Sequence, residues 1–218
     1  MKKIILVAAF AMLTVFGAFA QDNDEKVYLN PVTNIRIGYA GVLNADKNLA
    51  GGVDVGVNMF EVGVRPYDSG KFSLGADVIF DSFRAKDGYY FNSVAHKTEL
   101  VPGVGMKKLN NSHLNICSFA FPLNFTQTFG DKLNLTIGAS AKVNLNADTS
   151  TEYTNATDDR SALSVYGVET RRISYDIHLS VTYDDFGIYA SYSPMSVFQN
   201  GNGPAFSFFT VGAIFTTD

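Results

Sequence analysis

A period-two alternation of apolar and polar residues runs through this chain, and its longest unbroken stretch is LNLTIGASAKVNLN, residues 133–146. Every odd position there is apolar or small, and every even position is polar or glycine. Successive side chains of a β-strand point to opposite faces, so the stretch predicts a strand with one apolar and one polar face. Its 14 residues are long for a soluble protein, whose strands usually have about five or six. The sheet must therefore separate two different environments over an unusual length.

Seven further stretches alternate in the same way, so that eight strands are predicted in all. The alternation changes phase at Met59–Phe60, which predicts a β-bulge, and again near Cys117–Ser118. Pro122 weakens the fourth strand because proline donates no ladder hydrogen bond. The predicted strands cover residues 34–42, 52–65, 71–84, 113–127, 133–146, 172–183, 186–194 and 205–215.

The connections between these strands are short and long in strict alternation. Residues 66–70, 128–131 and 184–185 form short turns, whereas residues 43–51, 85–112, 147–171 and 195–204 form longer polar segments. A barrel across an outer membrane has tight turns on its periplasmic side and large loops outside. The predicted fold is therefore all-β, an eight-stranded antiparallel up-and-down transmembrane β-barrel with both termini on the periplasmic side.

The first 20 residues have the layout of a secretory signal peptide: two lysines, an apolar run, and the small-residue pattern AFA before Gln21. The apolar run is shorter than the roughly 20 residues that a membrane-spanning helix needs. We expect residues 1–20 to be cleaved, residues 21–33 to form a periplasmic N-terminal segment, and residues 34–218 to form the barrel. Removing 20 of 218 residues leaves 198, a length that fits one domain.

Charge and cysteine content exclude several classes of function. The formal charge of −4 becomes −6 once Lys2 and Lys3 are removed, which argues against a nucleic-acid partner. Cys117 is the only cysteine, so no disulfide can form within the chain, and it is interpreted as a small apolar side chain. The sequence has no cluster of His, Cys and Asp with the spacing of a metal site, and we expect no metal, no cofactor and no catalytic residue.

Alternation alone does not separate a membrane barrel from a soluble one such as a lipocalin, whose interior is apolar. Three features favour the membrane. A strand of 14 residues tilted by about 40° rises about 35 Å, more than the roughly 25 Å apolar band of such barrels. The polar face is rich in glycine and charge, which suits a narrow lumen. Aromatic residues gather near strand ends, as interfacial girdles do, at Tyr39, Phe80, Phe125, Tyr183, Phe186, Tyr192, Phe209 and Phe215.

The charged residues of the polar faces predict a network inside the lumen. Side chains just fill the interior of an eight-stranded barrel, and unpaired buried charges are costly. A mixture of both signs therefore favours an internal ion-pair network and a plugged lumen, with a narrow or gated channel as the alternative. The expected cations are Arg36, Arg65, Lys142 and Arg172, and the expected anions are Asp54, Glu61, Asp77, Asp81 and Asp176. We expect Lys142 to meet a carboxylate across the barrel.

The long loops carry the remaining candidate residues. Ser93, His96, Glu99 and His113 form a conceivable site for a membrane acyltransferase or protease, but no motif fixes their spacing, and we expect no enzyme. His178 belongs to the polar face of a strand. Loops 85–112 and 147–171 mix Tyr, Asn, Ser and Asp, which suits contacts with envelope or surface proteins or with glycans. The alternative is that these loops are only solvated tips.

Two segments resemble a known family: FAFPLNFTQTFGDKLNLTIGASAKVNL, residues 119–145, and FGIYASYSPMSVFQNGNGPAFSFFTVGAIF, residues 186–215. They resemble the outer-membrane-protein β-barrel domain family that includes PorT-like proteins, and more widely the small barrels of OmpX/OmpA type. The resemblance implies a porin-like barrel in the outer membrane of a Gram-negative cell envelope, in contact with outer-membrane lipid and inserted by the barrel-assembly machinery. Many members end on an aromatic residue, whereas here Phe215 is followed by TTD, and the absence of Trp leaves Phe and Tyr to form the girdles.

Overall fold

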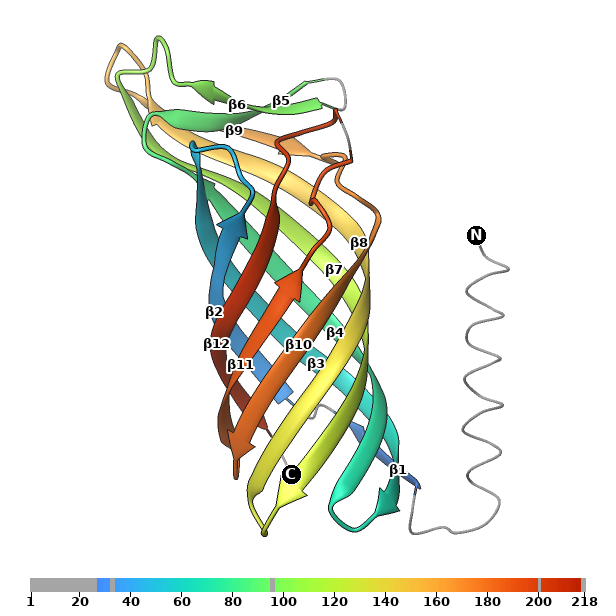
Figure 1. Ribbon diagram of the computed structural model, residues 1–218. Coiled ribbons are helices and arrows are strands. Elements are labelled where there is room, and N and C mark those ends of the chain that lie inside the picture. Colours follow the sequence, from blue (N-terminus) through green and yellow to red (C-terminus); the bar gives the residue numbers. More distant parts are fainter. Residues whose placement is uncertain (1–26, 32–33, 95–96, 200, 217–218) are drawn as a thin grey trace.

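A ring of eight antiparallel strands forms the molecule (Figure 1). The computed structural model describes residues 27–31, 34–94, 97–199 and 201–216, so the expected signal peptide lies outside the described residues. The ring consists, in order, of β2 (Asn34–Leu43), β3 (Leu49–Tyr67), β4 (Gly70–Ala85), β7 (Lys108–Phe129), β8 (Leu133–Thr154), β10 (Ile173–Tyr183), β11 (Phe186–Ser193) and β12 (Ser207–Thr216), which pairs with β2. The predicted eight-stranded antiparallel up-and-down barrel is confirmed.

The two ends of the ring differ, as the connection lengths predict. The turns between β3 and β4, β7 and β8, and β10 and β11 are short and lie at what we call the turn end, while the longer connections lie at the loop end (Figure 1). The connection from β10 to β11 has only two residues, and Asp184 adopts a φ of 56° there. Aspartate tolerates this left-handed conformation better than most residues, which explains how so short a turn forms without glycine. The described residues include no helix able to cross a membrane.

The expected change of phase at Met59–Phe60 is found, but β7 itself keeps one phase near Cys117–Ser118, because its even-numbered residues from Ser112 to Ala120 all face inward. The register between β3 and β4 shifts at Asn58/Phe60, and Met59 and Phe60 are both exposed, which is the predicted bulge. The register between β7 and β8 shifts at Cys117/Ser118, where the extra residue is Leu145 of β8. Beyond Leu145, the odd-numbered residues of β8 turn inward, which is why the alternation of residues 133–146 ends at this height.

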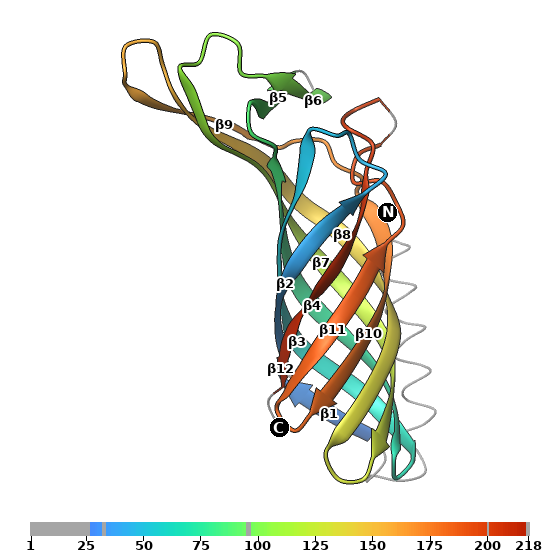
Figure 2. The same cartoon turned by 60° about the vertical axis from the view of Figure 1, so that its left-hand side comes forward.

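Strands replace much of the two longest predicted loops. β7 and β8 have 22 residues each and extend past the ring at the loop end, where β9 (Arg160–Tyr166) pairs with β8. A separate hairpin, β5 (Tyr89–Val94) with β6 (Lys97–Pro102), lies beside this extension (Figure 2). The expectation of loops at 85–112 and 147–171 was therefore wrong for most of these residues. These strands were not predicted because neither face of the extension touches lipid, so their sequences are polar and show no apolar face.

The N-terminal segment also contributes a strand. β1 (Val27–Pro31) pairs with the part of β3 that β2 does not reach, from Val27 opposite Val64 to Pro31 opposite Phe60. Residues 27–31 of the expected periplasmic segment 21–33 thus join the barrel sheet.

The outer surface of the ring is apolar. Ile137, Ile177 and Val211 point outward at mid-height and are 59, 54 and 52% exposed. Aromatic side chains flank this band, and two pairs at the turn end, Phe72–Phe125 and Phe186–Phe215, have ring centroids 4.8 and 5.4 Å apart. An apolar exterior of this kind is the opposite of a lipocalin, whose outside is polar.

Candidate functional site: the barrel lumen

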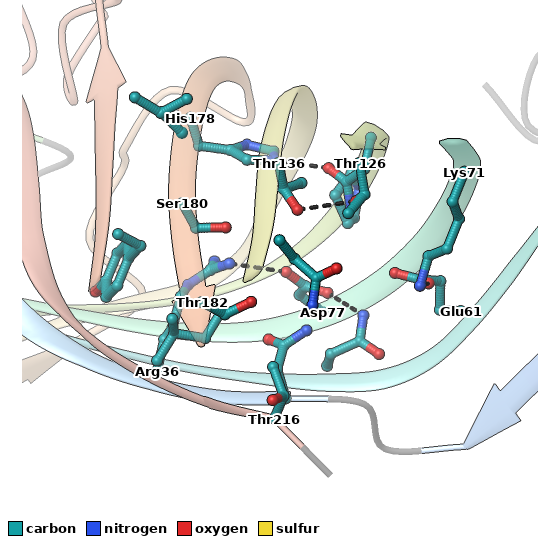
Figure 3. Close-up of a pocket in the computed structure, with 18 of the residues that line it drawn as sticks. Arg36, Glu61, Lys71, Asp77, Thr126, Thr136, His178, Ser180, Thr182 and Thr216 are labelled. Carbon is teal, nitrogen blue, oxygen red and sulfur yellow. Dashed lines mark hydrogen bonds and ion pairs between the residues drawn. The ribbon is translucent and has the colours of Figure 1, made fainter. Parts of the chain in front are cut away.

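A polar cavity of about 450 Å³ occupies the turn-end part of the lumen. It reaches from the turn residues Asp68, Asp131 and Asp184 inward to a group of charged side chains that includes Arg36 and Asp77. Figure 3 shows Arg36 and Asp77 meeting inside the barrel, with Lys71 and Glu61 together on another part of the wall.

Arg36 and Asp77 form the first buried ion pair. Arg36 Nη1 lies 3.0 Å from Asp77 Oδ2, and its Nε lies 3.9 Å from Asp54 Oδ1. Asn58 Nδ2 donates to the other carboxylate oxygen of Asp77 over 2.7 Å. Three strands, β2, β3 and β4, are thereby tied together from the inside.

Lys142 forms the second buried centre. Its Nζ lies 3.0 Å from Asp81 Oδ2 on β4 and 3.4 Å from Asp176 Oδ2 on β10, so it does meet carboxylates of other strands. Ser193 donates a hydrogen bond to the other oxygen of Asp176, and the Phe208 ring lies 5.2 Å from the ammonium nitrogen. Lys142 is only 3% exposed, so its charge is satisfied entirely by these neighbours.

Tyr189 is a member of the network that the sequence analysis did not select. Its hydroxyl donates to Asp54 Oδ1, although two strands, β12 and β2, lie between them. Gly38 makes this reach possible, because a Cβ there would stand 2.6 Å from the Tyr189 hydroxyl oxygen and 2.8 Å from the Val211 carbonyl oxygen. The signal for Tyr189 was present as a large aromatic residue on a polar face otherwise built of Gly and Ser.

Glu61 belongs to a third group at the turn end. Lys71 Nζ lies 2.7 Å from Glu61 Oε1, and the Tyr28 hydroxyl donates to the same oxygen over 3.0 Å. The ring of Tyr28 also lies under two cations, Lys71 Nζ at 4.8 Å and Arg65 Cζ at 5.7 Å. Through Tyr28, the strand β1 is fastened to the mouth of the cavity.

Two predicted cations stand apart from the buried ion pairs, although Arg65 still lines the cavity. Arg65 is exposed at the mouth beside Tyr28, and Arg172 is exposed at the loop end, just before β10 begins. The neighbouring Arg171 turns inward instead, and its Nε donates to the Ser196 carbonyl oxygen over 2.9 Å. Arg172 was assigned to the lumen by extending the alternation of β10 one residue beyond the start of the strand.

Uncharged polar groups complete the cavity wall. His178 Nε2 lies 2.7 Å from Asn124 Oδ1, and its Nδ1 lies 3.4 Å from Ser140 Oγ. Thr126 and Thr136 join their hydroxyls over 2.8 Å (Figure 3). These contacts link β7, β8 and β10 and give His178 a structural position among neutral partners.

Above the charged groups, the lumen becomes apolar. We call this region the apolar cap, and its largest members are Leu49, Phe83, Phe91, Leu114, Phe198 and Phe206, each at most 2% exposed. Phe83 packs its ring edge-on against Phe206, with centroids 5.0 Å apart. Phe91 comes from β5, and Phe198 and Phe206 come from the connection between β11 and β12, so the loops themselves fill the barrel. The sequence-based prediction of a polar lumen throughout is therefore wrong for the loop end, where this cap lies.

The conceivable rim site is not assembled among the described residues. Ser93 shares a hydrogen bond with Thr98, Glu99 pairs with Lys97, and His113 lies 3.5 Å from the Ser82 hydroxyl. His96 lies outside the described residues. The described part of the chain also holds no cluster of three or more His, Cys, Asp or Glu residues able to bind a metal ion.

An eight-stranded antiparallel ring, apolar outside and charged inside, defines a small transmembrane β-barrel of the outer-membrane type. No protein-family model matches the sequence, and no curated protein matches it. Among solved structures, the chain is similar to Ail, the attachment invasion locus protein of Yersinia pestis, with 12% identity and a TM-score of 0.35 over 86% of this chain and 99% of that one. A mutant Rh. blastica porin matches with 9% identity and a TM-score of 0.23 over 88% of this chain and 100% of that one.

Proposed function

We propose that this protein is a non-conducting outer-membrane barrel that holds an interaction platform at the cell surface and has no enzymatic activity. One observation supports the proposal: ion pairs cross the lumen at one height, and the apolar cap fills it at the next. The closed lumen leaves the loop-end extension as the part of the molecule that can act on other molecules.

The ion pairs close the lumen because their charges are held by direct contacts between strands. Arg36 bridges β2 to β4, and Lys142 bridges β8 to both β4 and β10. An ion passing this height would have to displace one of these buried partners, and breaking such a pair costs about 3 to 5 kcal/mol. The apolar cap adds a second barrier, since its fully buried aromatic rings offer no hydrogen bonds to water.

The platform consists of the β7–β8–β9 extension and the β5–β6 hairpin. Buried hydroxyls join the two parts, because Ser112 Oγ accepts from the Phe91 backbone N–H over 3.0 Å and shares a hydrogen bond with Thr151 over 2.8 Å. At the end of the extension farthest from the ring, Lys107, in the connection between β6 and β7, forms an ion pair with Asp158, in the connection between β8 and β9. A fixed surface of this kind, with Tyr166 77% exposed on β9, is suited to binding an envelope or surface protein or a glycan.

Conductance through a planar lipid bilayer tests the closed lumen. We expect the purified wild-type barrel to show no stable unitary currents. Stable currents that change when Arg36→Gln or Lys142→Gln neutralises a lumen cation would contradict the proposal. Arg172→Gln removes an exposed cation at the loop end and is the matched control, because a current that passes the ion pairs should respond much less to it.

A narrow channel is the second candidate, and the polar cavity of about 450 Å³ at the turn end favours it. This cavity supplies a wetted entrance on one side of the barrier. Under this alternative, the ion pairs would act as a selectivity constriction, and the currents described above would be present in the wild type.

Capture of partners from the native envelope tests the platform. We expect Tyr166→Ala to weaken capture of the proteins or glycans that wild-type barrel retains. Tyr183→Ala removes a side chain of similar exposure, 63%, at the turn end and is the control. Identical capture by wild type and Tyr166→Ala would remove β9 from the proposed surface.

A further inference from the structure

The buried charges of the lumen do not balance. Four carboxyl groups, those of Asp54, Asp77, Asp81 and Asp176, are 3 to 6% exposed, whereas among the described residues only two cations, Arg36 and Lys142, contact them. If all four carboxyls were ionised, this part of the barrel would carry two excess negative charges away from water. Uncompensated charges in such a place are expensive, and a carboxyl group then takes up a proton instead.

Asp54 and Asp81 are the pair in which this excess is concentrated. They stand directly opposite each other in the β3–β4 ladder, and both side chains are buried inside the barrel. Two ionised carboxylates in directly opposed positions repel each other. The strand register that places these two carboxyl groups opposite each other is therefore stable only if a neutral or positive group lies between them.

Within the described part of the chain, the other contacts of Asp54 and Asp81 leave one buried carboxyl oxygen without a hydrogen-bond donor. Asp81 Oδ2 accepts from Lys142, and Asp54 Oδ1 accepts from the Tyr189 hydroxyl. Asp81 Oδ1 is buried and has no hydrogen-bond partner among the described donors. The buried Asp81 Oδ1 therefore lacks one hydrogen, which a proton on either carboxyl group of the opposed pair would supply.

We propose that Asp54 and Asp81 form a proton-binding site in the lumen, in which one carboxyl group is protonated and donates a hydrogen bond to the carboxylate of the other. The bound proton gives Asp81 Oδ1 its missing partner and lowers the excess negative charge from two to one. The ligand of this site is a proton, because the site lacks one hydrogen and already holds the ammonium group of Lys142 as its cation. The site does not depend on whether the lumen conducts.

The side chains around Asp54 and Asp81 support the proposal that the two carboxyl groups share one proton. Arg36 on β2, Asp77 on β4, Lys142 on β8, Asp176 on β10 and Tyr189 on β11 are the charged and titratable groups that face it. Lys142 binds Asp81 Oδ2 and Tyr189 binds Asp54 Oδ1, which leaves Asp81 Oδ1 and Asp54 Oδ2 as the oxygens available for the shared proton. β7 and β12 contribute only uncharged side chains at this height, among them Ser118 and Thr210.

Infrared difference spectroscopy on the barrel folded in phosphatidylcholine vesicles tests the site. We expect a carbonyl stretch of a protonated carboxyl group at neutral pH, absent from both Asp81→Asn and Asp54→Asn. Each amide preserves every contact, since its nitrogen replaces the shared proton as donor and its oxygen still accepts from Lys142 or Tyr189. Both variants should therefore fold and remain about as stable as wild type.

Asp77→Asn is the matched control, because it makes the same substitution on the same strand. Both oxygens of Asp77 already accept hydrogen bonds, from Arg36 and Asn58, so an amide nitrogen there would face a donor. We expect this variant to be destabilised but to keep the carbonyl band. A wild-type spectrum without the band, or a band that survives both Asp54→Asn and Asp81→Asn, would overturn the proposal.

The pH dependence of unfolding gives an independent measure. The folded barrel binds one proton that the unfolded chain releases above about pH 4, so its stability falls as pH rises until the site itself loses the proton. The unfolding equilibrium constant of wild type should rise about tenfold per pH unit relative to Asp81→Asn in this range. Parallel pH profiles of the two proteins would contradict a site occupied by a proton.

Discussion

Arg36 Nη1 lies 3.0 Å from Asp77 Oδ2, and this contact joins β2 to β4 across the intervening strand β3. Asp77 is 3% exposed and the Arg36 side chain 18%, so the pair is largely buried at the inner part of the polar cavity. Neighbouring strands of the ring are held by backbone ladders, but only side chains can join strands that are not neighbours. The lumen network therefore supplies cohesion that the backbone hydrogen bonds cannot supply.

Removing the cation of this pair should destabilise the barrel strongly. Arg36→Met leaves the carboxylates of Asp77 and Asp54 buried with no partner on β2, which should cost about 3 to 5 kcal/mol. Urea unfolding of the barrel in lipid vesicles measures the loss. Arg172→Met should change the free energy of unfolding by no more than about 0.5 kcal/mol, because Arg172 is exposed at the loop end. Equal effects of the two substitutions would show that the lumen pair is not a stabilising contact.

Gly38 should be needed for the position of Tyr189. A Cβ at Gly38 would stand 2.6 Å from the Tyr189 hydroxyl oxygen, so Gly38→Ala should displace that side chain and cost about 1 to 3 kcal/mol. Tyr189→Phe removes the oxygen atom that causes part of the clash. In a double-mutant cycle, the two substitutions should therefore cost less together than the sum of their separate costs. Strict additivity would mean that the glycine and the tyrosine are not coupled.

The outward face should be intolerant of charge only where lipid covers it. Ile137 points outward at mid-height of β8, and Ile137→Arg should cost about 2 to 4 kcal/mol of stability in a bilayer. Ser164→Arg places the same residue on the exposed strand β9, beyond the ring, and should have little effect. Folding yield into vesicles, read from the shift in gel mobility on heating, compares the two. A well-folded, more soluble Ile137→Arg variant would favour a soluble barrel.

The sequence predicted the barrel well because the lipid-facing side chains repeat with a period of two in every strand. The outward orientation of Ile137 and Val211 can be predicted from the sequence for this reason. The bulge at Met59 and Phe60 can be predicted as well, because two apolar residues follow each other there. The extension was missed because Thr149 and Thr151 face inward there while neither side of the sheet meets lipid, so that apolar and polar residues no longer mark the two faces.

The lumen was predicted less completely than the exterior. Alternation shows that Lys142 and Asp81 face inward, but not that they meet, since their contact depends on the curvature that brings β8 and β4 together. The apolar cap illustrates the same limit. Phe198 belongs to a connection with no periodic pattern, and Phe206 lies at the start of the predicted strand 205–215 but before β12 begins, so only the closed ring shows that both fill its loop end.

The orientation of the barrel can be read by labelling cysteines on intact cells. With Cys117→Ser as background, Ala156→Cys places a thiol at the exposed connection between β8 and β9, and Asp68→Cys places one at the exposed turn between β3 and β4. Short turns of outer-membrane barrels face the periplasm. A membrane-impermeant maleimide should therefore label Ala156→Cys on intact cells and should label Asp68→Cys only after the outer membrane is permeabilised. Labelling of Asp68→Cys alone on intact cells would invert the barrel and place the polar cavity, rather than the β7–β8–β9 extension, at the cell surface.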